Sequence, residues 1–526
     1  MLFADVVQAS TVVTATRSRL AKTEALATAL RSAAELEPES GAATASSAER
    51  TAAVRAVAGF LTGAPVQGRI GTGWRTLARL DQEPAATPTL TVSDVDAALT
   101  ELGEIAGAGA QGRRGELLAR LMQRATAAEQ DFLVRLLTGE LRQGALEGVM
   151  LDAIGKACGI EGERVRRAFM LSGSLPDTAA SALLGGGDAL DAFGLEVGRP
   201  VRPMLASPGE SLAAALAELG PAVRVEYKLD GARIQVHRSG DDVRVFTRTL
   251  REITADVPEL VELVLALPCR SVVLDGETLA LTDDGRPRPF QETMSRFGAT
   301  SERELLLRPY FFDCLHLDGV DLLDAPLSER IDALDRVARE HRIPGVTEPT
   351  EDQAAALLES ALADGHEGVM VKSLTAPYAA GRRGKAWQKV KPVHTLDLVV
   401  LAAEWGHGRR TGLLSNLHLG ARDPDGGPPV MVGKTFKGLT DELLAWQTTT
   451  FPEYESRHTE WTVYLRPELV VEIALDGVQV SPRYPGGVAL RFARVLRYRP
   501  DKDAAQADTI DAVRALLPGK GQSGEE

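Results

Sequence analysis

The stretch EYKLDGAR, residues 226–233, decides how the rest of the chain is interpreted. Residues 223–227 alternate between apolar and polar side chains, which is typical of a β-strand, and the Asp-Gly pair that follows favours a turn. Lys228 is therefore expected at the mouth of a pocket. A lysine becomes a nucleophile when it loses its proton, and desolvation or nearby cations lower its pKa.

The Lys-x-Asp-Gly pattern alone is weak evidence. Average residue frequencies produce it by chance in roughly one chain of this length in ten. A solvated hairpin turn explains the segment about equally well when it is taken by itself. Motifs elsewhere in the chain must therefore decide between a nucleophile and a plain turn.

Three regions of different pattern follow one another, and 526 residues are too many for one compact core. Apolar residues recur at helical spacing over 1–195, whereas 196–393 mixes strands and helices. Residues 394–518 contain five or so strands and one short helix, which would suit a small β-barrel. The polar tail 519–526 is predicted to be disordered.

Five further motifs follow Lys228 along the chain. They are VLDGE at 273–277, YFFD at 310–313, EGVMVK at 367–372, the segment 378–391 that ends in WQKVK, and RFARVLRYRPDK at 491–502. With these motifs the chain resembles the ATP-dependent DNA ligases, a branch of the covalent nucleotidyltransferases. Six ordered matches leave little room for coincidence, and the resemblance covers nearly the whole chain.

The resemblance implies a multidomain fold: an all-α DNA-binding domain over 1–195, an α+β adenylation domain over 196–393 and an OB-fold β-barrel over 394–518. It makes Lys228 the residue that carries AMP, and Asp230 a helper in the later, DNA-bound steps. The positions that it implies for ATP binding are Glu226, Arg233, Arg248, Glu277, Phe312, Arg383, Lys389 and Lys391.

The residue types suit these roles. Glu226 can accept a hydrogen bond from the exocyclic amine of adenine, and Arg233 and Arg248 can donate paired hydrogen bonds to ribose or phosphate oxygens. The resemblance makes Glu277 and Glu367 the metal-binding positions, and Mg²⁺ prefers a few carboxylates while it keeps its waters. The competing interpretation of each residue is an ordinary strand side chain.

Two assignments have close competitors in the sequence. Phe312 matches the aromatic residue that stacks on adenine, but Phe311 lies beside it on the opposite face of the same strand, and either one suits a core. Among the phosphate-binding positions, Arg383 competes with the adjacent Arg382 because the register could slip by one residue.

Two elements outside the central region also carry expectations. By resemblance, Arg499, Asp501 and Lys502 lie on the OB-fold and orient the pyrophosphate leaving group in the first step only, so the domain must close and reopen. A basic tail on the last strand is the alternative. In the helical region, Arg142 followed by Gly144 suggests a helix end whose amides face a DNA phosphate.

The resemblance implies three phosphoryl transfers. Lys228 attacks the α-phosphate of ATP, AMP passes to the 5′-phosphate at a nick, and the 3′-hydroxyl then expels AMP. We therefore expect ATP as substrate, Mg²⁺ as cofactor, and nicked duplex DNA that a monomer encircles through backbone contacts. NAD is not expected, because three scattered cysteines cannot build the four-cysteine zinc finger of the NAD-dependent ligases.

Composition limits these expectations. The net charge of −14 argues mildly against DNA binding, although affinity depends on local basic surface and not on the total charge. Unpaired cysteines fit a reducing compartment, and no apolar run reaches membrane-spanning length, so we expect a cytoplasmic protein without a membrane partner. Roles in DNA replication, repair or recombination are not distinguished.

Two other functions stay open. An RNA ligase or an RNA capping guanylyltransferase shares the lysine chemistry, although these enzymes usually lack a large helical N-terminal domain. A non-catalytic nick-binding clamp is expected to lose Lys228, Glu277 or Lys391, and none of the three is lost.

Overall fold

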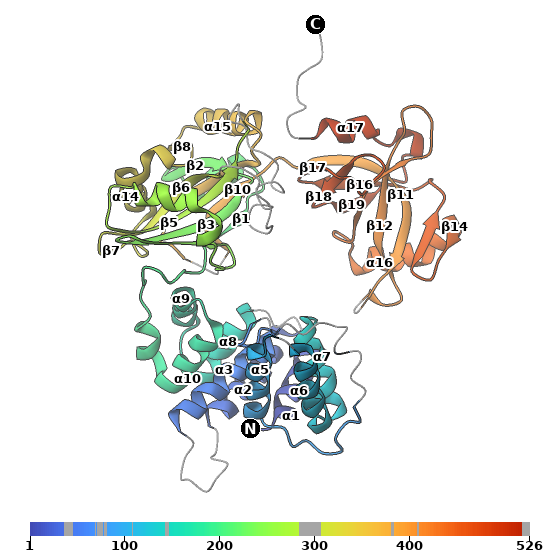
Figure 1. Cartoon of the computed structure of the whole chain (residues 1–526). Helices are drawn as coiled ribbons and strands as arrows, with labels where there is room; N and C mark the ends of the chain where they lie inside the picture. The colour runs from blue at the N-terminus through green and yellow to red at the C-terminus, as the bar shows by residue number, and fades with distance from the viewer. Residues whose placement is uncertain are drawn as a thin grey trace.

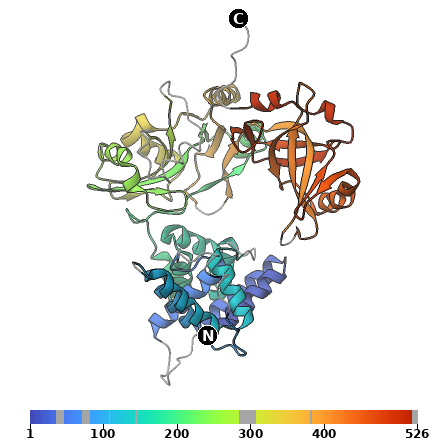
Figure 2. The ribbon, with the colours of Figure 1, turned by 45° about the vertical axis from the view of Figure 1, so that its right-hand side comes forward.

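The chain folds into a helical N-terminal region, a central region of strands and helices, and a strand-rich C-terminal region (Figures 1 and 2). This arrangement confirms the predicted fold class. None of the helices described is long and apolar enough to cross a membrane. The computed structural model describes residues 1–35, 46–68, 70, 77, 82–107, 109–141, 147–282, 307–379, 383–407 and 410–517, so the tail 519–526 lies outside them.

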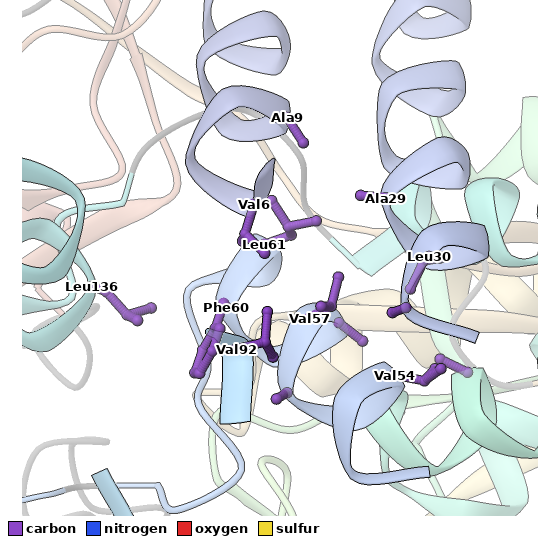
Figure 3. Packing of buried hydrophobic residues seen from close by; sticks show 14 of the residues in the cluster. Val6, Ala9, Ala29, Leu30, Val54, Val57, Phe60, Leu61, Val92 and Leu136 are labelled. Carbon is purple, nitrogen blue, oxygen red and sulfur yellow. The ribbon is translucent and has the colours of Figure 1, made fainter. Parts of the chain in front are cut away.

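The N-terminal helices pack around one apolar core (Figure 3). Their boundaries follow local chemistry: Ser46 and Glu49 form a capping box that begins α3, and Gly63 ends it at φ 73°. Phe3 and Phe60 meet edge to face at 5.8 Å inside this core. The helices are α1 Phe3–Ala15, α2 Arg19–Ala34, α3 Ser47–Thr62, α5 Val92–Glu104, α6 Ala110–Arg124, α7 Ala127–Thr138, α8 Glu147–Cys158, α9 Gly162–Ser172 and α10 Leu175–Asp191.

Two five-stranded sheets form the central region. One has the order β1-β10-β9-β2-β8 and the other β4-β3-β5-β6-β7. The strands are β1 Leu205–Pro208, β2 Val223–Lys228, β3 Ala232–Ser239, β4 Asp242–Thr247, β5 Ser271–Ala280, β6 Leu307–Leu317, β7 Val320–Asp321, β8 Gly345–Thr347, β9 Gly368–Ser373 and β10 Arg383–Val390. The helices are α11 Leu212–Leu219, η1 Thr254–Asp256, α12 Pro258–Leu265, α14 Leu327–Ala338, η2 Arg339–His341 and α15 Glu351–Ala363.

The second sheet separates two apolar clusters. Phe312 and Leu315 of β6 pack in one cluster with Val223 and Val225 of β2, so this cluster joins the two sheets. Phe311, the next residue along β6, belongs to the other cluster, which includes residues of α12 and α14. The two faces of β6 therefore pack in different apolar clusters, because successive side chains of a strand point to opposite faces of the sheet.

A buried ion pair fixes α14 to the second sheet. Arg330 and Asp313 are both fully buried, and the guanidinium donates from Nε at 2.7 Å and from Nη2 at 3.1 Å to the two carboxylate oxygens. Arg330 Nη1 also donates to the carbonyl oxygens of Ala325 and Ala376, at 2.6 and 3.0 Å. A buried pair with all its groups hydrogen-bonded tolerates the loss of neither partner.

We expect Arg330→Met to destabilise the central region by about 3–5 kcal/mol, because it leaves the Asp313 carboxylate buried without its counterion. The melting temperature in calorimetry reports the loss. The double variant Arg330→Met, Asp313→Leu removes both charges and should recover much of it. A double variant as unstable as the single one would contradict this explanation.

The C-terminal region is organised around the long strand β11, which pairs with β12, β15 and β16. Its strands are β11 His394–Trp405, β12 Leu414–Ala421, β13 Val430–Thr435, β14 Glu455–His458, β15 Thr462–Leu465, β16 Val470–Leu475, β17 Gly477–Val480, β18 Val488–Arg491 and β19 Arg494–Tyr498. Its helices are α16 Asp441–Thr450, η4 Phe451–Tyr454, η5 Ala504–Gln506 and α17 Ile510–Ala515.

Candidate active site

Lys228 ends β2 and lies beside Glu367, the residue before β9. The amide of Glu367 donates to the Lys228 carbonyl oxygen at 3.0 Å, and Lys228 pairs with Gly368 in the ladder. Gly368 has φ 138°, and a Cβ there would meet the Val390 carbonyl oxygen at 2.2 Å. Only glycine lets the end of β10 approach so closely, and this approach brings Lys391 to the same carboxylate.

The Glu367 carboxylate is the counterion of both lysines. Its Oε2 lies 2.5 Å from the Nζ of Lys228 and 2.5 Å from the Nζ of Lys391. Burial raises the pKa of Glu367, but the two lysines outweigh burial and lower it to about 2. Glu367 is therefore ionised at neutral pH.

The charges around Glu367 act on the pKa of Lys228 in the opposite sense. Burial lowers the pKa of Lys228, but Glu367, Glu277 and Asp230 outweigh burial, so the pKa is raised. This differs from the expectation that the surroundings of Lys228 lower its pKa. The reason is that carboxylates, more than cations, surround the amine, so Lys228 is a protonated lysine in this state.

Glu277 on β5 faces the same cluster. Its Oε1 accepts a hydrogen bond from the Gly231 amide at 3.1 Å, directly after Asp230. Burial raises the pKa of Glu277 to about 7, against the attraction of Lys228 and Arg233. Within the described parts of the chain, no three metal-binding side chains cluster.

Glu277→Gln should stabilise the ligand-free protein at pH 8. The pKa of Glu277 in the folded protein is about 7, above its ordinary value of 4.5. Ionisation of Glu277 therefore costs the wild-type protein no stability below pH 4.5, and it lowers the free energy of unfolding progressively as the pH rises to 7. Glutamine does not ionise and avoids this loss, which is at most about 3 kcal/mol at pH 8 and under about 1 kcal/mol at pH 5. Melting temperatures of both proteins at the two pH values measure the difference. An equal effect at both pH values would contradict it.

Two residues of the C-terminal region complete the cluster. Arg491 at the end of β18 donates from Nη1 to Asp230 Oδ2 at 2.6 Å and from Nη2 to Asp230 Oδ1 at 3.2 Å. Its Nη2 also lies 3.7 Å from Glu367 Oε1, and Asp476 Oδ2 lies 3.6 Å from Lys391 Nζ. The sequence interpretation did not select Arg491 or Asp476, although Arg491 opens the last motif.

Arg499, Asp501 and Lys502 lie elsewhere in this state. Arg499 and Lys502 both pair with Asp397 on β11, and Arg499 also pairs with Asp501. Among the described residues, Arg499, Asp501 and Lys502 form their ion pairs with Asp397 and with one another, and not with Glu367, Lys228 or Lys391. The C-terminal region thus contacts the residues around Lys228 through Arg491 and Asp476, and not through the predicted element.

Glu226 lies two residues before Lys228 on β2, in a buried charge network. It accepts from Arg224 Nε at 3.2 Å and pairs with Lys372 of β9. The Lys372 ammonium lies 4.2 Å from the ring centroids of Phe312 and of Trp387, and burial lowers its pKa although Glu226 opposes this. Phe312, and not Phe311, therefore shares a compartment with Glu226.

Arg233 is held by Asp275 and by the chain segment that enters the central region. Its Nε and Nη2 donate to the Asp275 oxygens at 3.0 and 2.6 Å, and its Nη1 donates to the Met204 carbonyl oxygen at 2.6 Å. Tyr378 donates to Asp275 at 2.6 Å and accepts from the Met204 amide at 3.0 Å. The guanidinium lies 5.4 Å from the Phe312 ring centroid. Sequence reasoning missed Asp275 as the residue that orients Arg233.

Fewer contacts are described for the remaining predicted residues than for those around Lys228. Arg248 is exposed in the turn after β4 and lines a hollow of about 300 Å³ together with Arg166, Phe169 and Arg202. Burial lowers the pKa of Lys389, and Lys391 and Lys228 lower it further. The side chain of Arg383, and Arg142 and Gly144 entirely, fall outside the described residues.

Comparison with known proteins covers all three regions. Family models match residues 75–155 (DNA ligase N terminus), 203–391 (ATP dependent DNA ligase domain) and 410–502 (ATP dependent DNA ligase C terminal region). A probable DNA ligase of Rhodococcus jostii is 69% identical over 99% of this chain and 100% of its own length. One of Saccharopolyspora erythraea is 66% identical over 98% of each chain.

A solved structure named Pmar-Lig_PreS3 aligns with 94% of this chain and 99% of its own length, at a TM-score of 0.57 and 18% identity, which shows a shared fold. The family models and the long, highly identical relatives go further than the fold. Together they show that this chain belongs to the ATP-dependent DNA ligase family.

Proposed function

We propose that the chain seals nicks in duplex DNA with ATP through an AMP adduct on Lys228. The observation that carries the proposal is the position of Lys228 in a ligase adenylation domain, 2.5 Å from a carboxylate that it shares with Lys391. Reaction of Lys228 Nζ with the α-phosphate of ATP forms a phosphoramidate (P–N) bond and releases pyrophosphate. AMP then passes to the 5′-phosphate of the nick, and the 3′-hydroxyl displaces it to form the phosphodiester.

Charge balance explains how the site would be activated. Lys228 must lose a proton before it attacks, yet the carboxylates around it now raise its pKa. Glu277 and Glu367 repel each other, and burial already raises the pKa of Glu277 to about 7, so the pair fits a cation. We assign Mg²⁺ to these two carboxylates; when bound, it supplies positive charge that offsets them and the triphosphate and so favours the neutral amine.

The residues around Phe312 would hold the nucleotide. We assign the adenine to the Phe312 ring, with Glu226 as the hydrogen-bond acceptor of its amine and Arg233 at the ribose. Lys389 and Lys391 provide charge for the phosphates, and Arg248 and Arg383 are further candidates on the same grounds. Arg224 and Asp275 act as positioning residues, because they fix Glu226 and Arg233.

The three regions together would enclose the DNA. We propose domain boundaries near residues 195 and 393, and a monomer that closes around the duplex and contacts its backbone. Ion pairs at both junctions support a closed arrangement: Arg167 donates to Asp324 at 2.5 and 2.7 Å, and Arg491 donates to Asp230. A cytoplasmic location fits an enzyme that uses ATP and DNA. We further assign Arg142 and Gly144 to a DNA phosphate.

Intact mass measurement tests the nucleophile. After incubation with ATP and Mg²⁺ but without DNA, wild type should gain the mass of one AMP and Lys228→Ala should gain none. The matched control is Lys385→Ala, which removes an exposed lysine of β10 and should keep the adduct. A chase with nicked DNA should discharge the adduct and yield sealed product. An adduct that survives in Lys228→Ala would identify another nucleophile, and no adduct in wild type would overturn the proposed function.

A further inference from the structure

The carboxylate of Asp397 gathers the two cations of the RPDK element. Arg499 Nη1 lies 3.0 Å from Asp397 Oδ1 and 2.9 Å from Oδ2, and Lys502 Nζ lies 2.6 Å from Oδ2. Asp397 lies on β11, about a hundred residues earlier in the chain, and β16 separates β11 from β19 in the sheet. The contact therefore reaches across a strand and is not a local consequence of the turn.

Asp397 is itself held in place. Its amide donates to Asp508 Oδ2 at 2.7 Å, and the Asp508 amide donates back to the Asp397 carbonyl oxygen at 2.8 Å. The Asp397 side chain is only 12% exposed. Because its backbone is held and its side chain is shielded from solvent, the Asp397 carboxylate has a restricted orientation. The positions of Arg499 and Lys502, which donate to its oxygens, are restricted with it.

Arg499 also forms an ion pair with a second carboxylate, that of Asp501. Its Nε and Nη2 donate to Asp501 at 2.9 and 2.6 Å. A guanidinium carries five N–H groups, so it can hold two carboxylates and still donate to an oxyanion. Without Asp397, two cations three residues apart would repel each other and their long side chains would separate. Asp397 thus keeps the Arg499 guanidinium and the Lys502 ammonium on one carboxylate.

The cluster belongs to one domain. Asp397, Asp508 and the RPDK element all lie in the C-terminal region, whereas the contacts of that region with Lys391 and Asp230 come from Asp476 and Arg491. For Arg499 and Lys502 to reach the triphosphate, the C-terminal region must turn, and Asp397 would travel with them. The cation pair would therefore arrive already oriented.

We propose that Asp397 is a positioning residue for the adenylation step: it holds Arg499 and Lys502 in the geometry that receives the pyrophosphate leaving group. This inference rests on the proposed function of the same element. It predicts a defect confined to the step in which pyrophosphate leaves. Joining an already adenylated nick needs neither ATP nor pyrophosphate, so that step should not depend on Asp397.

The test uses the full chain with Asp397→Asn, which keeps the shape of the side chain and removes its charge. The rate of Lys228 adenylation should fall about 10- to 100-fold, since a misplaced cation pair no longer meets the leaving group. In the reverse reaction, the pyrophosphate concentration that half-maximally discharges the AMP adduct should rise by a similar factor. Sealing of a pre-adenylated nick without ATP should stay within about twofold of wild type.

Glu404→Gln is the matched control. Glu404 also lies on β11 and also pairs with a lysine, Lys434, so it reproduces the loss of a β11 carboxylate without touching the element. The control should adenylate and seal like wild type. Melting temperatures identify any variant that is simply unfolded. In that case Asp397→Glu, which keeps the charge but moves it by one methylene, should show a smaller loss limited to adenylation.

Three outcomes would overturn the inference. Adenylation could be unchanged in Asp397→Asn, it could fall together with sealing of the pre-adenylated nick, or it could rise because Asp397 competes with the phosphates for the two cations. A wild-type protein that forms no AMP adduct would instead overturn the proposed function, and the two failures are thereby distinguished.

Discussion

The Glu367 carboxylate is the contact on which the arrangement of the site depends. It joins the end of β2 to the end of β10, because Lys228 and Lys391 share its Oε2, and Arg491 of the C-terminal region approaches its other oxygen at 3.7 Å. Two ammonium groups cannot stay this close without a shared anion. The same anion raises the pKa of Lys228, so the contact that assembles the site also keeps Lys228 protonated, the form in which an amine is not a nucleophile.

Buried ion pairs also fix side chains around Phe312, where we propose that the nucleotide binds. Arg233 pairs with Asp275, and Glu226 pairs with Arg224 and Lys372, so both of these predicted nucleotide-binding side chains already have a protein partner. Such pairs add little net stability compared with an apolar core, but they fix side-chain orientation when every group is hydrogen-bonded. A preoriented site avoids part of the reorganisation that a charged ligand would otherwise require.

The sequence predicted the three-region fold and most of the residues that surround Lys228, because strand alternation and motif order are local properties of the chain. Resemblance to the ligases supplied the roles that those residues were given. It did not predict that Arg491 and Asp476, rather than Arg499 and Lys502, would contact Asp230, Glu367 and Lys391 beside Lys228. That outcome depends on which face the C-terminal region presents, and domain orientation leaves no period or spacing in the sequence. Asp275 and Asp397 were missed for a similar reason, since their partners are distant in the chain.

The C-terminal region thus carries two different charge arrangements. Arg491 pairs with Asp230 across the junction with the adenylation domain. Arg499 and Lys502 are instead neutralised within the C-terminal region by Asp397 and Asp501. Because these carboxylates already neutralise the two cations, moving the cations to a site without phosphates would gain little electrostatic free energy. A bound triphosphate would attract both cations and supply that gain. Occupancy of the nucleotide site would then bias which contacts the C-terminal region makes, because a ligand that binds one arrangement better shifts the equilibrium toward it.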